Sequence, residues 1–575
     1  MGVDRRGFLR RGAAGAALVG LGGLVGAGCA RPLLPHPGAA PRAPGESPFR
    51  HGVASGDPLA DRVVLWTRVS PEAYRMAAAV SVGWWIARDA AGRDVVTRGR
   101  TEATPDRDFT VKVDASGLAP GNAYWYGFVC EGVASPAGRT RTLPADDARD
   151  VRGVRFALAS CANLPQGFFN AYACIAARDD LDAVLHLGDY LYEYGNGEYG
   201  DGTAIGRLPD PIHEIVTLED YRRRHARYKT DPDLQAAHAR HPWIAVWDDH
   251  ESANDSWKDG AQNHTEGDAP GDAQGRGRGE GAWQTRRLAA IRAYYEWMPI
   301  RELPTGLFRR FAFGDLVDLV MLDTRLHGRD ARVGAADLAG ANDPARSLLG
   351  ADQTQWLLDA LSRSKRAGTA WRLIGQQVVF TPLAGVFGEF NADAWDGYRA
   401  SRRAVLDHLE GEAIGNVVIA TGDVHSAWAF DVLPDAGADY DPATGRGARA
   451  VEVVAPAVSS PPFGSHPRGA EMLERAAPLN PQIRHSNAFE NGWVLLDLTT
   501  ERVRAAFFAS DPVERRSPVC ALRATLESRS GTNHWVEVET GHASRGAVEA
   551  REGMRPASES KRGAVRMRRV VRANA

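Results

Sequence analysis

The sequence predicts an α+β chain in which a small β-sandwich precedes a larger, layered α/β domain. Three observations lead to this fold class. Residues 48–145 contain aromatic and β-branched runs separated by turn signals, which is typical of a sandwich. From about residue 150, apolar runs of strand length alternate with helical stretches, as in α/β layering. At 575 residues the chain exceeds one typical core, so two or more domains are expected.

The first 29 residues are interpreted as a targeting segment. Arg5 and Arg6 precede an apolar, glycine-rich run at residues 13–28, which is typical of a twin-arginine signal and too short for a comfortable membrane span. Cys29 follows Gly-Ala-Gly as in a lipoprotein cleavage site, but the usual leucine three positions earlier is absent. Lipid anchoring and its absence both stay open. We expect export by the twin-arginine machinery to the periplasm, the cell surface or the medium.

Two further segments have biased composition. Residues 30–47 are rich in proline, alanine and glycine and are interpreted as a linker. Residues 541–575 are polar and basic, and we predict a disordered tail there. The net charge of the whole chain is only −3, so nothing in its balance calls for nucleic acid as a partner, except as a substrate.

The sandwich segment, residues 48–145, has strand-like runs at residues 63–69, 80–86 and 124–129. Turn signals lie between them, at residues 88–92 and 118–121. His51 and Asp57 are interpreted as turn and packing residues. No chemistry is expected from this part of the chain.

In the α/β domain, residues 150–540, helices are predicted over residues 169–178, 218–229 and 283–298. Buried strands are predicted over residues 317–322, 371–379 and 417–420. In the third helix, Leu288, Ile291 and Tyr295 are expected to face the core. Residues 258–281 form a predicted loop long enough to be functional or mobile.

Cysteine usage is sparse. Five scattered cysteines do not make a disulfide framework. If Cys161 binds metal and Cys29 is removed or lipidated, at most one pair can form in the mature protein. The sequence does not say which of Cys130, Cys174 and Cys520 would form it.

Four apolar runs of strand length end abruptly in residues that can bind metals. These runs with their polar ends occupy residues 156–161, 183–192, 243–251 and 417–425. Strands of an open sheet deliver such residues to the carboxyl edge, where ligands usually bind. Carboxylates suit calcium or manganese, whereas thiolate and imidazole suit iron or zinc. The sequence therefore predicts a metal centre with more than one ion.

The order of these motifs resembles that of the calcineurin-like metallophosphoesterases, and within them the PhoD-type alkaline phosphatases. The motifs are Cys161, Gly188-Asp189-x-x-Tyr192, Asp249-His250-Glu251 and Gly422-Asp423-x-His425. The resemblance extends from about residue 46 to about residue 515. It implies an immunoglobulin-like domain at residues 48–145 and a four-layer α/β/β/α metallophosphoesterase domain at residues 150–540.

The resemblance also implies one Fe³⁺ and calcium ions, which we take to be two Ca²⁺. Four residues match the iron side: Cys161, Asp189, Tyr192 and His425. Asp189 would bridge to calcium. The candidates for the calcium side are Asp249, Asn254 and Asp423. Spacing alone does not divide the ligands between ions, and each residue has a structural alternative, such as a buried cysteine for Cys161.

Candidate catalytic residues are His250, Arg325 and Asp323. His250 would protonate the leaving group or orient the substrate, and Arg325 would either bind a phosphate oxygen or pair with Asp323. Glu251 is interpreted as orienting a ligand histidine. The expected residues of the substrate pocket are Asp248, Gln376, Trp395, Asp396 and Tyr398.

The expected activity is hydrolysis of small phosphate monoesters at alkaline pH, by a monomer in which metal activates water or oxide. The chain has neither a phosphate-cradling loop with lysine nor a serine nucleophile elbow. The close alternative is a phosphodiesterase or phospholipase D-like enzyme acting on wall polymers, lipids or nucleic acid. Rivals from other classes are an iron oxidoreductase and a surface-binding protein with a structural metal site.

Overall fold

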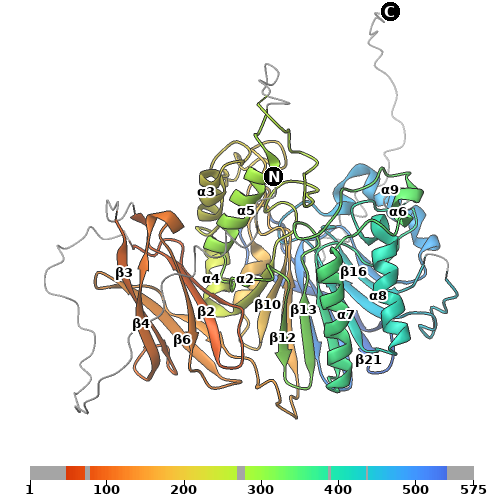
Figure 1. The fold of residues 1–575 in the computed structure, drawn as a ribbon, viewed down its shortest axis with the longest axis horizontal. Helices are drawn as coiled ribbons and strands as arrows, with labels where there is room; N and C mark the ends of the chain where they lie inside the picture. The colour runs from red at the N-terminus through yellow and green to blue at the C-terminus, as the bar shows by residue number, and fades with distance from the viewer. Residues whose placement is uncertain (1–46, 72–77, 269–278, 386–389, 436–437, 541–575) are drawn as a thin grey trace, which may run out of the picture.

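A computed structural model describes residues 47–71, 78–268, 279–385, 390–435 and 438–540 of the chain. The predicted signal at residues 1–29, nearly all of the linker and the tail at 541–575 lie outside the described residues. Two large sheets form the body of the molecule, and a smaller sheet from the N-terminal part lies at one end of it (Figure 1). In the described residues, no helix is both long and apolar enough to span a membrane.

The first sheet has ten strands in the order β22-β21-β20-β19-β9-β10-β11-β1-β2-β5. Its centre is parallel, because β10 pairs in parallel with both β9 and β11. The strands are β1 (Val53–Gly56), β2 (Arg62–Arg68), β5 (Thr110–Ser116), β9 (Val154–Ala159), β10 (Ala183–Leu187), β11 (Pro242–Val246), β19 (Gly492–Leu498), β20 (Arg502–Ser510), β21 (Cys520–Arg529) and β22 (Val536–Thr540).

The second sheet has seven strands in the order β12-β13-β14-β15-β17-β16-β18. Here β13, β14, β15 and β17 are parallel, with antiparallel strands outside them. The strands are β12 (Arg309–Phe313), β13 (Val317–Met321), β14 (Trp371–Gly375), β15 (Val417–Thr421), β16 (Ala427–Val432), β17 (Ala450–Val454) and β18 (Ile483–Asn487). The predicted strand over residues 371–379 thus ends earlier, at Gly375.

Helices cover the outer faces of both sheets (Figure 1). On the first sheet, α2 (Asn170–Ala176) contacts β19–β21 and α4 (Pro232–Arg240) contacts β1 and β11. The buried side chains of α7 (Ala351–Arg366) and α8 (Arg399–Gly411) share a core with the second sheet. The remaining helices are α3 (Leu218–Tyr228), α5 (Trp283–Trp297), α6 (Leu338–Asn342) and α9 (Pro467–Ala476), with short 3₁₀ turns at Pro105–Arg107, Trp395–Tyr398, Phe463–Ser465 and Ala477–Leu479.

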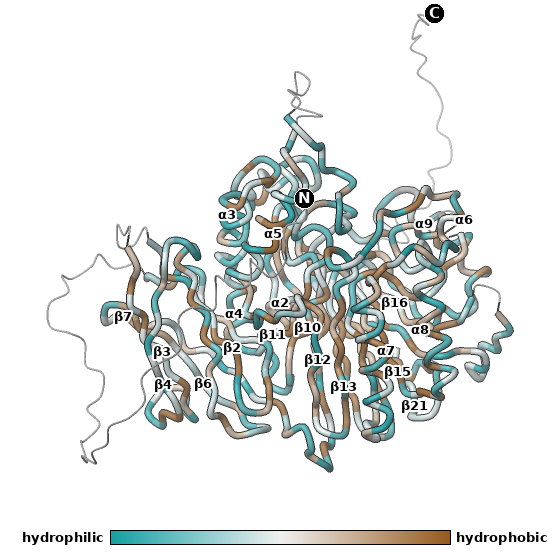
Figure 2. The backbone as a smooth tube through the Cα atoms, viewed as in Figure 1, coloured by the Kyte–Doolittle hydropathy of each residue, from teal (hydrophilic) through white to brown (hydrophobic). Residues whose placement is uncertain are grey.

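The main core joins the two sheets. Side chains of β9, β10 and β11 share one buried cluster with those of β13, β14 and β15, and Phe156 meets Phe313 edge to face at 5.1 Å. Apolar residues run along β10, β12 and β13 through the middle of the molecule (Figure 2). Strands covered on both faces are hydrophobic throughout, which is why these runs were visible in the sequence.

All three predicted helices are present, as α2, α3 and α5. The expected apolar face of α5 is partly wrong, because Leu288 is 49% exposed. Its buried side instead includes Trp283, Tyr294 and Trp297. Two of these aromatic rings point toward neighbouring elements, with Trp297 against Trp66 of β2 and Tyr294 against Trp247.

The N-terminal segment contributes to two sheets. The smaller sheet has the order β4-β3-β6-β7, with β8 paired to β6, and it shares a core with β1, β2 and β5. Its strands are β3 (Val80–Ala87), β4 (Val95–Ala103), β6 (Ala123–Cys130), β7 (Val133–Ala134) and β8 (Gly138–Arg141). Because β1 pairs in parallel with β11, the large sheet runs across the predicted boundary near residue 145.

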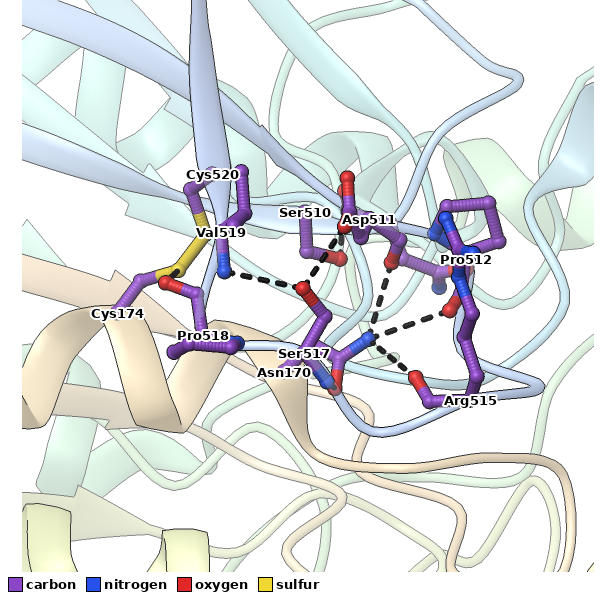
Figure 3. Close-up of a disulfide and its surroundings, with 11 residues drawn as sticks. Asn170, Cys174, Ser510, Asp511, Pro512, Arg515, Ser517, Pro518, Val519 and Cys520 are labelled. Carbon is purple, nitrogen blue, oxygen red and sulfur yellow. Dashed lines mark hydrogen bonds between the residues drawn. A yellow bond between two sulfur atoms is a disulfide. The ribbon is translucent and has the colours of Figure 1, made fainter.

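A disulfide joins Cys174 of α2 to Cys520 of β21, 346 residues apart in the sequence (Figure 3). Next to it, the Asn170 amide donates hydrogen bonds to the carbonyls of Asp511, Pro512 and Arg515. Among the described residues, Cys130 and Cys161 are buried and form no disulfide. The one pair left open by the sequence is therefore Cys174–Cys520, and it fastens the late strands of the sheet to an early helix.

Candidate metal centre

Four strand ends meet at one edge of the two sheets. Cys161 follows β9, Asp189 follows β10, and residues 248–251 follow β11, three neighbouring parallel strands of the first sheet. Asp423 and His425 follow β15 of the facing sheet. Because the carboxyl ends of parallel strands point the same way, the chain delivers these side chains to a common place.

The backbone at these strand ends turns sharply. Four of the predicted ligands adopt left-handed conformations, with φ of 60° at Cys161, 55° at Asp189, 68° at Asp423 and 51° at His425. Non-glycine residues rarely adopt φ above zero, and such conformations gather at functional sites. The surrounding structure thus holds these four residues in geometry that they would not adopt alone.

Two glycines allow the strand ends to approach. A Cβ on Gly188, whose φ is 102°, would lie 2.4 Å from the Cβ of Asp248. A Cβ on Gly422 would lie 2.9 Å from the carbonyl oxygen of Leu187, across the gap between the sheets. Both positions need glycine because backbone or Cβ atoms, which cannot move aside, occupy the space.

The first group of side chains contains Cys161, Asp189 and His425, whose ligand atoms lie within 4.8 Å of one another. The Tyr192 hydroxyl joins them, 2.9 Å from Asp189 Oδ2 and 3.0 Å from His425 Nε2. The His425 Nδ1 lies 3.2 Å from the carbonyl oxygen of Pro461, which favours a proton on Nδ1 and leaves Nε2 free as a ligand. The four predicted iron ligands are therefore together.

Two further groups continue from the first. Asp189, Asp249 and His250 form one, and Asp248, Asp249 and Asp423 form the other, each within 4.8 Å. Asp189 belongs to the first two groups and Asp249 to the last two. The shared carboxylates connect three adjoining positions, each with ligand atoms for a cation. These three groups together are called the ligand cluster.

Three carboxylates of these groups are buried and incompletely paired. Asp189 Oδ1, Asp248 Oδ2 and Asp249 Oδ1 are buried without a hydrogen-bond partner. Burial raises the pKa of Asp189 and Asp248 well above the usual value, and raises that of Asp423 to about 7 against the pull of Arg325. Unpaired buried carboxylate oxygens are costly, and bound cations would satisfy them.

Asp249 differs from its neighbours. Burial alone would raise its pKa, but the charges of Arg325 and His250 outweigh burial and lower the pKa to about 2. Its Oδ2 also accepts a hydrogen bond from the Asp255 backbone at 2.6 Å. Asp249 is therefore the carboxylate of the cluster that is held most firmly as an anion.

Arg325 is fully buried and faces only carboxylates. Its guanidinium donates to Asp248, to Asp393 at 2.7 Å and to Asp423 at 3.2 Å, and lies 3.6 Å from Asp249. The alternative of a surface pair with Asp323 is wrong. The fully buried guanidinium lies among aspartates that include members of the third ligand group.

Asp323 shapes the loop that carries Arg325. Its Oδ1 accepts hydrogen bonds from the backbone N–H groups of Arg325 and Leu326, at 2.9 and 2.8 Å. These bonds place Asp323 under the turn and direct Arg325 toward the cluster. The structure assigns its carboxylate to backbone contacts, and a catalytic role for it stays a prediction.

His250 is held by a residue that the sequence analysis missed. Glu193 Oε2 lies 2.7 Å from His250 Nδ1, and Oε1 accepts from the Asn254 backbone and the Asn263 amide. Burial opposes protonation of His250, but the charges of Asp249 and Glu193 raise its pKa well above the usual value. Glu193 follows Tyr192 directly, yet nothing in the sequence marks it as the partner of a histidine 57 residues away.

The role predicted for Glu251 is wrong. Its carboxylate accepts hydrogen bonds from the backbone N–H groups of Asp189, Tyr190 and Asp248, at 3.1, 2.6 and 2.8 Å. Burial raises the pKa of Glu251 to about 8. Glu251 therefore shapes the ends of β10 and β11, whereas the histidine is oriented by Glu193.

The Asn254 amide donates to Gln262 Oε1 at 2.8 Å, beside the Glu193 contact of its backbone. This places it next to His250, and its membership of the calcium side stays a prediction. Gln376 is buried, and its amide donates to Thr421 Oγ1, two residues before Asp423. Trp395 Nε1 donates to Gln376 Oε1 at 3.1 Å. Gln376 thus hydrogen-bonds to the end of β15, and Trp395 holds Gln376 in place.

The last two pocket candidates contact structural partners. The Asp396 carboxylate is paired with Arg402 at 2.6 Å and accepts from the Leu383 backbone. The Tyr398 hydroxyl donates to the Asp330 carbonyl, and its ring faces the guanidinium of Arg329 at 5.0 Å. Of the five predicted pocket residues, Asp248 is the one that the structure places in the ligand cluster.

These features define the class of the protein. It is a two-sheet α+β protein whose carboxyl strand ends carry a carboxylate-rich candidate site for several metal ions, with a thiol, a phenol and an imidazole at one end.

The chain belongs to the PhoD-like phosphatase family. The family model matches residues 156–507, and the model of the N-terminal domain of PhoD-like phosphatases matches residues 36–144. Alkaline phosphatase D of Bacillus subtilis (strain 168) is 39% identical over 406 residues, which cover 68% of this chain and 66% of that protein. The match thus spans just under two thirds of the length of this curated relative.

A solved structure of PhoD overlays with a TM-score of 0.75 at 33% identity, and the overlay covers 88% of this chain and 95% of that one. The overlay supports the layered arrangement described above.

Proposed function

We propose that this protein is a metal-dependent hydrolase of phosphate esters. It would be an alkaline phosphatase of the D type that prefers monoesters. The observation that carries the proposal is the chain of three ligand groups that share Asp189 and Asp249. Its buried, unpaired carboxylate oxygens suit cations. Family membership and the 39% identity to an alkaline phosphatase D support the same activity.

The donor set supports different ions at the two ends. Thiol, phenol and imidazole at Cys161, Tyr192 and His425 suit Fe³⁺, which these residues would hold together with the carboxylate of Asp189. The oxygen donors of the other end suit two Ca²⁺, and they come from Asp248, Asp249, Asp423 and Asn254. When bound, such ions activate water and neutralise the charge of the phosphate.

The chain's own residues would handle the proton and the orientation. His250, held through Nδ1 by Glu193, would give a proton from its other nitrogen to the departing oxygen. The Arg325 guanidinium supplies a fixed positive charge behind the phosphate and keeps three aspartates in place. Leaving-group protonation and charge neutralisation are two of the requirements for hydrolysis of an unactivated ester.

The protein would act outside the cytoplasm. The twin-arginine pattern at residues 1–29 supports export, and a disulfide between Cys174 and Cys520 is typical of an oxidising compartment. Within the proposal, Cys29 is the site of an optional lipid anchor and the exported protein works as a monomer. The N-terminal sheets would be the immunoglobulin-like domain that the sequence predicts.

The test compares 4-nitrophenyl phosphate with bis(4-nitrophenyl) phosphate, each with calcium and after chelation. The expected result is faster hydrolysis of the monoester, abolished by chelation, together with iron and calcium found by elemental analysis. A diester preference would move the proposal to a phosphodiesterase on the same centre. Hydrolysis of neither ester by metal-replete protein would refute it.

A further inference from the structure

One side of the candidate metal centre is built from aromatic rings. Tyr192, Tyr194 and Tyr199 come from one loop, and His250 packs among them; these four rings are called the aromatic wall. Tyr194 lies 5.5 Å from both Tyr199 and His250, measured between ring centroids, and Tyr192 lies 4.3 Å from His250. Tyr199 is nearly parallel to His250, at an interplanar angle of 10°. Tyr194 and Tyr199 are half-buried and so reach the surface.

The other side of the centre is charged. It consists of Arg325 and its aspartate partners Asp248, Asp249, Asp393 and Asp423. The side chain of Asp423 is 21% exposed and that of Asp393 is 16% exposed. Asp423 of the cluster therefore reaches solvent, as do Tyr194 and Tyr199 of the aromatic wall.

The loop that carries the aromatic wall is fixed before any ligand binds. Arg224 of α3 is buried, and its guanidinium donates to the backbone carbonyls of Tyr192, Tyr194, Pro211 and His213. The Asn163 amide donates to the Tyr199 carbonyl at 2.8 Å. A binding surface that is already ordered costs little entropy when a ligand arrives.

We propose that the exposed part of the aromatic wall, Tyr194 and Tyr199, is a subsite for a flat ring in the alcohol part of the substrate, such as a nucleobase or an aryl group. The inference rests on the proposed function and names its substrate class. A phosphate held at the metal-ligand cluster directs its ester group outward. A flat apolar ring at this position would displace water from the charged groups, which is unfavourable. The same ring would stack on a tyrosine ring, which is favourable.

The experiment compares adenosine 5′-monophosphate with ribose 5-phosphate. Both are phosphate monoesters of a sugar 5-hydroxyl, so the departing alcohols are closely matched and the base is the main difference. The expected kcat/KM is higher for the nucleotide, and Tyr194→Leu lowers the nucleotide-to-sugar ratio about 10-fold, the scale of one base stacked on an aromatic ring. Tyr194→Phe keeps the ratio, because the ring remains.

Tyr194 is chosen because the Tyr199 hydroxyl lies 3.2 Å from His425 Nδ1 and its loss would disturb the ligand cluster. The matched control is Tyr440→Leu, which removes a half-buried tyrosine bonded to Asp431 and should leave the ratio unchanged. As a second measurement, adenosine should inhibit hydrolysis of ribose 5-phosphate in the wild type and much less in Tyr194→Leu.

The outcomes separate the two proposals. If the wild type hydrolyses both esters but with equal kcat/KM, or if Tyr194→Leu slows both equally, the subsite is overturned while the phosphatase stands. If metal-replete wild type hydrolyses neither ester, the proposed function itself fails. A higher ratio in Tyr194→Leu would show that the ring obstructs the base and would also overturn the subsite.

Discussion

Carboxylates lie at both ends of the central strands, but arginines balance their charge at the amino ends and only partly at the carboxyl ends. At the amino ends of β9 and β10, an open cavity of about 400 Å³ is lined by Arg141, Arg152, Arg155 and Arg502 together with Asp180, Asp182 and Asp497. At the carboxyl ends of the same strands lies the ligand cluster, where one fully buried arginine faces four aspartates.

Every carboxylate that lines the amino-end cavity has an arginine partner. Asp180 lies 3.0 Å from Arg155, Asp497 lies 3.4 Å from the same guanidinium, and Asp182 pairs with Arg141. These pairs are partly exposed, so each contributes only about 0–1 kcal/mol. The acids there are balanced by the chain itself and need no further cation.

The carboxyl end has an excess of acid that the chain does not balance. Asp189, Asp248 and Asp249 each keep a buried oxygen without a hydrogen-bond partner. A fold that left such atoms bare would lose stability. The comparison teaches that it is unpaired and strained acids, and not a gathering of acids as such, that indicate a metal site.

The largest expected difference between the two ends is in activity. Asp189→Asn should lower kcat/KM more than about 100-fold, because loss of a proposed metal ligand should exceed the 10–100-fold cost of losing a residue that only orients a ligand. Elemental analysis should show less bound metal in the same variant. Asp497→Asn is the amino-end control and should keep both activity and metal. Equal losses in the two variants would remove the distinction between the ends.

The contact between Glu193 and His250 should give the next largest effect. In the Glu193→Gln variant, the amide cannot accept and orient the Nδ1 proton of His250 as the carboxylate does, so kcat/KM should fall about 10–100-fold while the bound metal content stays unchanged. Steady-state kinetics across the pH range together with metal analysis test this. Loss of all metal in this variant would show that Glu193 acts through the fold of the site and not through His250.

The disulfide includes no residue of either charged cluster and should affect stability alone. Cys174→Ala with Cys520→Ala should lower the free energy of unfolding by roughly 2–5 kcal/mol, because the closed loop is very long. Thermal unfolding of oxidised wild type, reduced wild type and the double variant gives the measurement. A fall in kcat at a temperature where the variant is fully folded would contradict the separation.

A buried lysine allows a smaller test in a region without a ligand cluster. Burial lowers the pKa of Lys112 from 10.5 to about 8, against the pull of Glu302 at 3.4 Å. Between these values the unfolded chain holds the proton and the folded chain does not. Stability should therefore rise with pH from about 8 to about 10.5, by about 2–3 kcal/mol.

The measurement for Lys112 is denaturant unfolding at several pH values, with metal-loaded protein throughout. Lys112→Met has no such proton to lose, so its stability should change less over this interval than that of the wild type. A wild-type curve that falls with pH while the variant stays flat would reverse the sign and reject the assignment.

The sequence by itself determined the strand ends. Cys161, Asp189 and Asp423 each follow an apolar run, separated from it by only one or two glycine or polar residues. A local pattern was therefore enough to predict these strand ends. The layered α/β part and its family resemblance followed from the same motifs. The order of these motifs along the chain can be read from the sequence without any coordinates.

Only the tertiary structure decided which partners these residues meet. Glu193 and His250, Arg325 and Asp393, and Cys174 and Cys520 are distant in the sequence and become neighbours through the pairing and stacking of sheets. The same holds for the parallel pairing of β1 with β11, which joins the N-terminal strands to the large sheet. Periodicity reports which face of an element is buried, but it carries no information about what lies opposite that face.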